Sequence, residues 1–159
     1  MKLSDLIDTK AIVSELESTT KEDVIKELID ALAAAGKIDG KDNKKLIAAL
    51  MAREQLGSTG IGQGLAVPHA KHNSVGNLVA AFGRSKKGID FDSLDGEPVY
   101  LVFLLLSNKE ASGQHLEALA YITKLLRDDL FCRFLKEAKD HAELVELLKE
   151  ADQKLAAQG

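Results

Sequence analysis

The sequence is poor in several features that would point to a particular class of protein. Of its 159 residues, two are proline, one is cysteine and none is tryptophan. A single thiol, Cys132, cannot form an internal disulfide and is typical of a reducing compartment. The longest apolar run, residues 99–106, is too short to cross a bilayer, and the acidic amino terminus does not resemble a signal peptide. These absences predict a cytoplasmic protein without a membrane span.

Positive charge is also scarce. The 21 lysines and arginines are outnumbered by 25 aspartates and glutamates, which gives a net charge of −4. Nucleic-acid binding depends on basic surfaces, so this balance gives it no support. The hydrophobic share of 45% and the charged share of 29% are ordinary for a globular protein. With this length and no linker, one domain over residues 1–159 is predicted.

Hydrophobic periodicity predicts helices at both ends of the chain and strands in the middle. The helices are expected over residues 19–36 and 41–55, and again from residue 112, from Asp128 or Asp129, and from Asp140. The first opens with a capping box of Thr19 and Glu22 and ends at Gly36. Strands are expected at residues 11–13, 65–67, 78–82 and 99–106, with an irregular connection at 88–98. Helices around a small set of strands predict an α/β or α+β three-layer sandwich.

The most unusual stretch runs from Gly57 to Ala70. It has glycines at 57, 60, 62 and 64, then a short apolar segment that ends at Pro68-His69. Glycine lets backbone N–H groups approach a ligand closely, so such a loop could surround an anion beside a histidine stiffened by the proline. The stretch is neither a nucleotide P-loop nor a dinucleotide fingerprint. The alternative is that the glycines only form tight turns between a helix and a strand.

Two of the four histidines stand where a functional group would be placed. His69 ends a strand-like run and His115 lies in the first turn of a helix, whereas His72 and His141 are expected at the surface. A neutral imidazole can attack phosphorus, and a second histidine at a helix start can donate to phosphoryl oxygens. Arg53, just before the glycines, could grip the same oxygens. These residues predict a phosphoryl-transfer site.

Other interpretations of the same residues stay open at this point. His115 could merely cap its helix, and Arg53 could pair with Glu54 or Glu110. A metal site of His69, His72 and His115 has no carboxylate or cysteine at ligand spacing. A serine hydrolase using Ser58 or Ser74 with His69 lacks a nucleophile elbow. Neither a metal nor a cofactor is therefore predicted.

Longer motifs add a resemblance to a known family. Residues 53–62 and 64–70 resemble the active-site signature of phosphotransferase system IIA domains of the fructose, mannitol and nitrogen-regulatory class. Residues 88–91 and 95–96 are similar to that family's next landmark, and residues 115–120 to its second-histidine motif. The resemblance covers essentially the whole chain.

The resemblance implies a fold, a chemistry and partners. The fold would be a mixed β-sheet flanked by helices on both faces. His69 would accept a phosphoryl group from a histidine phosphocarrier protein, His115 would support that group, and Arg53 would share the site, with no metal or nucleotide required. The signature is closest to the nitrogen-regulatory branch, whose members bind regulatory targets. The alternatives are a fructose-type IIA component donating to a IIB protein, and an interaction module that transfers nothing.

Several geometric expectations follow. His69 and His115 should lie close enough for one phosphoryl group to touch both rings. Because donor and acceptor would be proteins, the site should be a shallow hollow with an apolar rim. Ile61 and Leu65 are candidates for that rim, and the alternative for either residue is a place in the core. Local basic groups, namely Arg53, Lys71 and Arg84, should steer docking.

Overall fold

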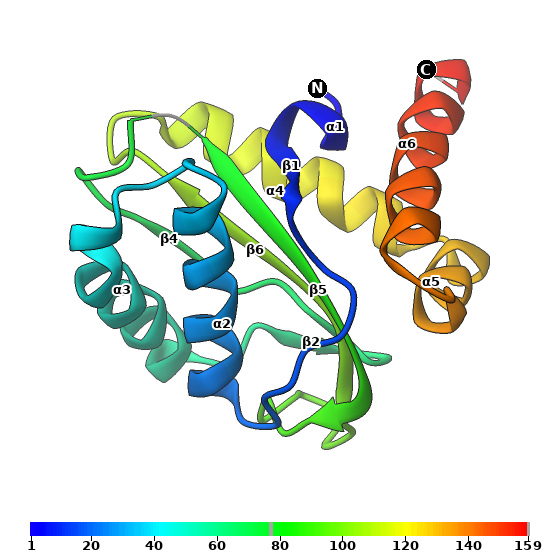
Figure 1. Cartoon of the computed structure of the whole chain (residues 1–159), viewed down its shortest axis with the longest axis horizontal. Helices are drawn as coiled ribbons and strands as arrows, with labels where there is room; N and C mark the ends of the chain where they lie inside the picture. Colours follow the sequence, from blue (N-terminus) through cyan, green and yellow to red (C-terminus); the bar gives the residue numbers. More distant parts are fainter. Residues whose placement is uncertain (77, 159) are drawn as a thin grey trace.

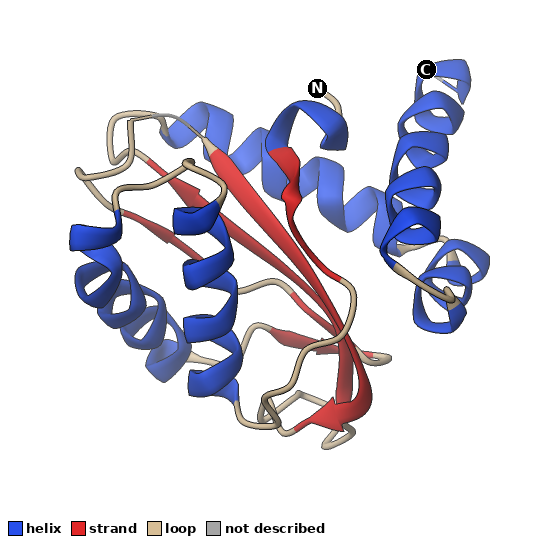
Figure 2. Ribbon diagram, viewed as in Figure 1, coloured by secondary structure: helices blue, strands red, loops and turns tan. Residues whose placement is uncertain are grey.

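The computed structural model describes residues 1–76 and 78–158 and has a six-stranded sheet with helices on both sides (Figures 1 and 2). The helices are α1 (Leu3–Leu6), α2 (Lys21–Ala34), α3 (Asn43–Leu56), α4 (Ser112–Leu126), α5 (Asp129–Glu137) and α6 (His141–Gln158), with a 3-10 turn η1 (Gly40–Asp42) before α3. The strands are β1 (Ile7–Val13), β2 (Gly60–Gly62), β3 (Leu65–Ala66), β4 (His69–Lys71), β5 (Val79–Ile89) and β6 (Val99–Ser107).

The sheet is mixed, as the family resemblance implied. Its order is β1-β5-β6-β3-β2, and β4 also pairs with β6. The antiparallel pair β5–β6 forms the centre, while β1 runs parallel to β5, and β3 and β4 run parallel to β6. The short strands β3 and β4 therefore lie along the same side of β6, one after the other, and β4 brings His69 beside the carboxyl end of β6.

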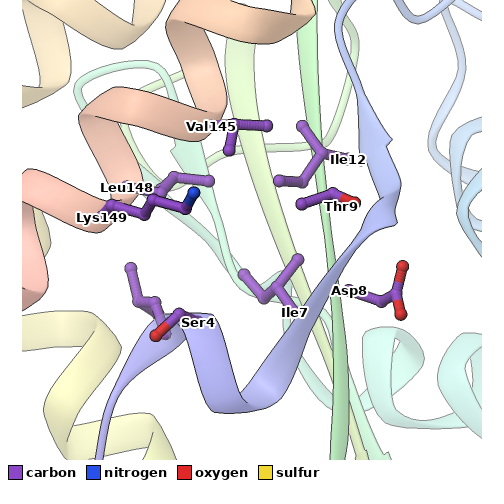
Figure 3. A pocket seen from close by; sticks show the side chains of 9 residues that line it. Ser4, Ile7, Asp8, Thr9, Ile12, Val145, Leu148 and Lys149 are labelled. Atoms are coloured by element: carbon purple, nitrogen blue, oxygen red, sulfur yellow. The ribbon is translucent and has the colours of Figure 1, made fainter.

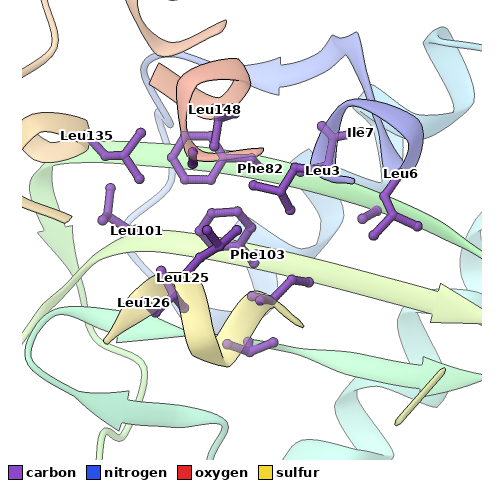
Figure 4. Close-up of a cluster of buried hydrophobic side chains, with 14 of the residues drawn as sticks. Leu3, Leu6, Ile7, Phe82, Leu101, Phe103, Leu125, Leu126, Leu135 and Leu148 are labelled. Atoms are coloured by element: carbon purple, nitrogen blue, oxygen red, sulfur yellow. The ribbon is translucent and has the colours of Figure 1, made fainter. Parts of the chain in front are cut away.

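Both faces of the central strands are buried, which explains why the apolar run in β6 shows no polar alternation. One face of β6 carries Leu101, Phe103 and Leu105 and packs against α1, α4, α5 and α6. The other face carries Val102, Leu104 and Leu106 and packs against α2 and α3. Figure 4 shows Phe82 and Phe103 between leucines of α4, α5 and α6, and their ring centroids are 4.7 Å apart. This arrangement confirms the three-layer sandwich.

The helix boundaries follow the capping residues, with one correction. α2 is capped by Thr20, whose side chain accepts from the Asp23 N–H, and not by Thr19. Gly36 follows α2 with a φ of 73°, a left-handed conformation that suits glycine just after a helix. At the other end of the chain, Asp128 caps α5 and the Asp140 side chain accepts from the Glu143 N–H. None of the helices in the described part of the chain is long and apolar enough to cross a bilayer.

The strands differ more from the expectations. β5 was expected to end at Phe82 but continues to Ile89, because its polar second half still pairs with the start of β6. Short elements were missed altogether: α1, β2 and β4 have too few residues to show a period. β4 is the one that matters for the site, since its three residues begin at His69.

Candidate active site

His69 is held in one orientation by the strand that precedes it. The Pro68 carbonyl accepts from the Leu105 N–H of β6 at 3.0 Å, and the His69 Nδ1 lies 2.8 Å from the Val67 carbonyl oxygen. A carbonyl can only accept, so Nδ1 carries the ring proton and Nε2 keeps its lone pair. Burial lowers the pKa of His69, and the positive charges of Arg53 and Lys71 lower it further. The ring is therefore neutral near pH 7, with a free nucleophilic nitrogen.

His115 faces His69 from the first turn of α4. The two ring centroids are 5.5 Å apart and the ring planes are inclined at 54°, which confirms that the two histidines lie together. His115 is almost fully buried, and this burial lowers its pKa to about 4, helped by the charges of His69 and Lys71. Its Nδ1 lies 2.5 Å from the hydroxyl oxygen of Ser107, so the ring is held by a side chain rather than serving as a helix cap.

Two basic side chains share a hollow with the histidines. Arg53, in the last turn of α3, donates to the Gly57 carbonyl at 2.8 Å, and Lys71 donates to the Ser112 hydroxyl at 3.2 Å. Both line an open hollow of about 590 Å³ together with His69 and His115. Neither Arg53 nor Lys71 forms a salt bridge within the described residues, so Arg53 does not pair with Glu54 or Glu110.

The rim of this hollow is apolar, as expected, but it is formed by residues other than Ile61 and Leu65. Leu56 of α3 and Leu116 of α4 border the hollow and are 86% and 65% exposed. Ile61 is exposed on β2 but does not line the hollow, and Leu65 is buried in the core beneath α4–α6. Neither residue forms the rim, because β3 pairs with the start of β6 at Leu101 and Val102, whereas β4 pairs with its end, and β2 lies on the far side of β3.

Arg84 does not take part in the site. Its side chain is 1% exposed; Nε donates to the Ser14 carbonyl at 2.8 Å, and one terminal nitrogen lies 2.8–3.2 Å from the carbonyls of Leu135, Lys136 and Ala138. The expectation that it steers docking was wrong. From the sequence, a charged residue in a polar stretch is expected to be exposed. The Arg84 guanidinium is buried instead, because it pairs with free backbone carbonyls at the end of α5.

The glycine stretch also has a different role from the expected anion cradle. Residues 60–62 and 65–66 form the β2–β3 hairpin, with Gly64 at a φ of 79° in its turn. None of the four glycines lines the hollow over His69. The preceding loop is anchored by Glu54, which is buried and accepts from both the Thr59 N–H and the Thr59 hydroxyl and from Lys21 at 3.0 Å. The tight-turn interpretation is therefore the correct one.

The other interpretations of the histidines find no support in the geometry. The His72 ring bonds to Ser74, and the exposed His141 bonds to the Thr9 carbonyl. Ser58 donates to the Phe91 carbonyl. Within residues 1–76 and 78–158, no three His, Cys, Asp or Glu side chains are grouped so that they could hold a metal ion.

A smaller hollow of about 260 Å³ lies elsewhere on the molecule. It is bordered by α1, β1 and α6, with Ser4, Ile7, Ile12, Val145 and Leu148 among its walls (Figure 3). No histidine lines it, so it offers no group of the kind found in the hollow at His69 and His115.

One residue in the surroundings of the histidine pair was not predicted from the sequence. Ser107 is fully buried at the end of β6, where it contacts His115. The available signal was a single polar residue directly after eight apolar ones, in a strand covered on both faces. Such a residue needs a hydrogen-bond partner in the interior.

Comparison with known proteins identifies the family. The family model described as "Phosphoenolpyruvate-dependent sugar phosphotransferase system, EIIA 2" matches residues 5–151. The PTS system fructose-specific EIIABC component of Bacillus subtilis is 40% identical over 152 residues, which are 96% of this chain and 24% of that protein. The nitrogen regulatory protein of Bradyrhizobium diazoefficiens is 38% identical over 140 residues, 88% of this chain and 90% of that protein.

A solved structure agrees with these relatives. The crystal structure of the nitrogen regulatory protein IIA-Ntr from Neisseria meningitidis superposes with a TM-score of 0.82 at 31% identity, covering 92% of this chain and 98% of that one. The chain belongs to the EIIA type 2 family of the phosphoenolpyruvate-dependent sugar phosphotransferase system. It is an EIIA phosphocarrier domain, a phosphohistidine-carrying component of a phosphotransferase.

Proposed function

We propose that His69 is the residue that carries the phosphoryl group, that His115 and Arg53 stabilise it there, and that the chain acts in nitrogen-type regulation. The observation that carries the proposal is the ring pair itself. His69 has a free Nε2 because its Nδ1 is bonded to the Val67 carbonyl, and the second imidazole stands 5.5 Å away. Phosphoryl transfer needs little beyond such positioning and charge stabilisation.

The transfer step follows from the state of each ring. Nε2 of His69 gives its lone pair to phosphorus in the phosphohistidine of a histidine phosphocarrier protein. The nitrogen–phosphorus bond of the donor breaks, and its electron pair stays on the donor's ring nitrogen. The proton on Nδ1 of His69 stays on that atom, held by the Val67 carbonyl. No proton has to move, and the positive charge that develops on the His69 ring is balanced by the incoming phosphoryl group.

The surroundings of His69 suit a transient dianion. Arg53 and Lys71 already lower the pKa of His69, which means that their charges act at the ring. The charge of Arg53 would stabilise a phosphoryl group bound at Nε2, and that of Lys71 would favour docking of the phosphorylated donor. The exposed Leu56 and Leu116 at the rim would pack against the protein that delivers or receives the group.

The experiment is phosphorylation of the full chain with phosphoenolpyruvate, the upstream kinase and the histidine phosphocarrier protein, followed by intact-mass spectrometry. We expect one added phosphoryl group that is lost in acid, none in His69→Ala, and normal labelling in the control His72→Ala. His115→Ala should still be labelled but should pass the group on poorly. Labelling of His69→Ala would show that another residue is the carrier, and no labelling of the wild type would favour an interaction module without transfer.

The regulatory role is supported by the resemblance of residues 53–62 to the nitrogen-regulatory signature and by the TM-score of 0.82 with the Neisseria protein. A second candidate is a fructose-type IIA component that donates to a IIB protein, and it is favoured by the 40% identity to the Bacillus EIIABC protein. Incubating the phosphorylated chain with a fructose-type IIB domain distinguishes the regulatory role from the transport role. Rapid loss of the label to IIB would support transport. A retained label, with phosphorylation-dependent binding to a regulatory protein, would support regulation. Location in the cytoplasm stays a prediction.

A further inference from the structure

Ser107 is the last residue of β6 and the partner of His115. Along β6 it follows Leu101, Phe103 and Leu105 on the face that packs against α4, so its side chain points toward the helix that carries His115. Its hydroxyl oxygen lies 2.5 Å from Nδ1 of that ring. Ser107 is 0% exposed and His115 is 3% exposed, so the contact is shielded from solvent.

The direction of this hydrogen bond follows from the partners available. Among residues 1–76 and 78–158, Nδ1 of His115 is the one partner of the Ser107 hydroxyl. If the hydroxyl accepted a proton from Nδ1, its own hydrogen would be buried without an acceptor, which is unfavourable. If the hydroxyl donates to Nδ1, neither group is left unpaired. The Ser107 hydroxyl is therefore the donor.

The donor direction determines where the His115 proton resides. Because burial keeps the pKa of His115 at about 4, the ring is neutral near pH 7 and carries a single proton. With Nδ1 accepting from Ser107, that proton is on Nε2. His69 has the opposite tautomer, because the Val67 carbonyl requires a proton on its Nδ1. The two facing rings thus present complementary groups, a lone pair on His69 and an N–H on His115.

We propose that Ser107 is a positioning residue, whose hydroxyl holds His115 in the Nε2–H tautomer so that this ring donates a hydrogen bond to the phosphoryl group on His69. The tautomer itself is a property of the unphosphorylated protein. The last step, donation to the phosphoryl group, rests on the proposed role of His69. A serine that only filled space at the end of β6 would not bias the proton between the two nitrogens.

The first test is long-range ¹H–¹⁵N NMR of the ¹⁵N-labelled full chain at pH 7.5, without phosphorylation. We expect His115 to have a protonated Nε2 and an unprotonated Nδ1, and His69 to have the reverse. Ser107→Ala should shift the His115 Nδ1 signal as its hydrogen bond is lost. Ser107→Asp, which can only accept when ionised, should move the proton to Nδ1. A wild-type His115 with its proton on Nδ1 would overturn the proposal without need of any variant.

The second test is single-turnover transfer from the phosphorylated histidine phosphocarrier protein. Ser107→Ala should slow the transfer rate at saturation roughly tenfold and leave the half-saturating donor concentration unchanged, because the docking surface is intact. Ser107→Thr, which restores the hydroxyl, should recover most of the rate. Equal rates for Ser107→Ala and wild type would refute the positioning role.

The two tests also separate this proposal from the proposed function. If His69 is not the carrier, the transfer assay fails in every variant, but the NMR tautomers can still be read. If His69 is the carrier and Ser107 has no positioning role, the wild type is phosphorylated normally and Ser107→Ala keeps both the spectrum and the rate.

Discussion

Two arginines show that the same side chain can be bound within the fold in one region and directed at an open hollow in another. Arg84, in the interior beneath α5, has its donors directed at four backbone carbonyls and is 1% exposed. Arg53, at the mouth of the site, donates to one carbonyl, that of Gly57, and lines an open hollow. Burial lowers the pKa of Arg84, whereas Arg53 acts on its neighbour by lowering the pKa of His69.

The difference lies in how many donors the protein itself uses. A guanidinium has five N–H donors in a rigid fork. At Arg84, Nε donates to the residue after β1 and one terminal nitrogen to the end of α5, so two of its three nitrogens are engaged within the fold. At Arg53 most of the fork has no protein partner among the described residues and is available for an anion. The number of engaged donors, more than burial, separates the two roles.

The largest effect is expected for a substitution in the interior, which tests whether Arg84 stabilises the fold. Arg84→Met removes the donors while keeping much of the packed volume, and it leaves buried carbonyls at the end of α5 without partners. We expect the free energy of unfolding to fall by about 3–5 kcal/mol, because each orphaned buried group costs roughly 1–3 kcal/mol. Urea unfolding followed by circular dichroism measures this loss.

The matched control is Lys86→Met on the same strand, where the side chain is exposed; its unfolding free energy should change by at most about 0.5 kcal/mol. At a temperature where Arg84→Met is still folded, its phosphoryl transfer should match the wild type. A stable Arg84→Met protein with impaired transfer would contradict the division between the two arginines.

Arg53→Gln should impair phosphoryl transfer and leave stability nearly unchanged, the reverse of Arg84→Met. The substitution keeps a polar side chain but removes the charge and the fork, so we expect the transfer rate from the phosphocarrier protein to fall about 100-fold. The unfolding free energy should drop by no more than about 1 kcal/mol, the usual value of one hydrogen bond. Arg133→Gln, an exposed arginine on α5, is the control and should transfer normally. Normal transfer by Arg53→Gln would exclude Arg53 from the site.

The contrast between the two arginines also indicates which features of the structure can be predicted from the sequence. Long segments such as α2, with its helical period, and the uninterrupted apolar run of β6 can be assigned from the sequence, because many residues carry the same signal. His69 and His115 stand out because a histidine at an element boundary is unusual, and their proximity was correctly predicted. Arg53 lines the same hollow as the two histidines, and its part in the chemistry, expected from the motif that surrounds it, stays a prediction.

Arg84 and Ser107 could not be placed in the same way. Whether a polar side chain is buried depends on partners far away in the sequence: the end of α5 is 51 to 54 residues beyond Arg84. Ser107 meets a ring in the next helix, and only the tertiary structure shows which atom it touches. The β2–β3 hairpin was missed because local composition could not distinguish a turn from an anion cradle.

His115 combines features of the two arginines: it is buried like Arg84 and lines the hollow like Arg53. Its pKa is about 4 in the folded protein, against 6.5 when unfolded. Between these values the unfolded chain binds more protons, so stability is fully present above pH 6.5 and is lost as the pH falls toward 4. From pH 7 to pH 5 this amounts to about 2 kcal/mol.

The measurement is the unfolding free energy at several pH values for wild type and His115→Gln. Carboxylates titrate in both proteins, so their contributions cancel in the difference, which reports the titration of His115 together with its coupling to His69. The wild type should lose about 2 kcal/mol more than the variant between pH 7 and pH 5. Parallel curves would mean that His115 is not held neutral by burial, and the tautomer assignment through Ser107 would lose its basis.

Replacing Lys71 should have the smallest effect, because its charge is expected to act on docking and not on the phosphoryl group itself. Its ammonium donates to Ser112 and keeps its other donors toward solvent beside the hollow. An exposed charge near a docking surface acts mainly on association and is screened by salt. Lys71→Gln should therefore lower the second-order rate of transfer about threefold at low salt, and the difference should vanish near 0.5 M salt. Lys124→Gln, at the far end of α4, should change nothing. A loss for Lys71→Gln that persists at high salt would instead place its ammonium directly on the phosphoryl group, with Arg53.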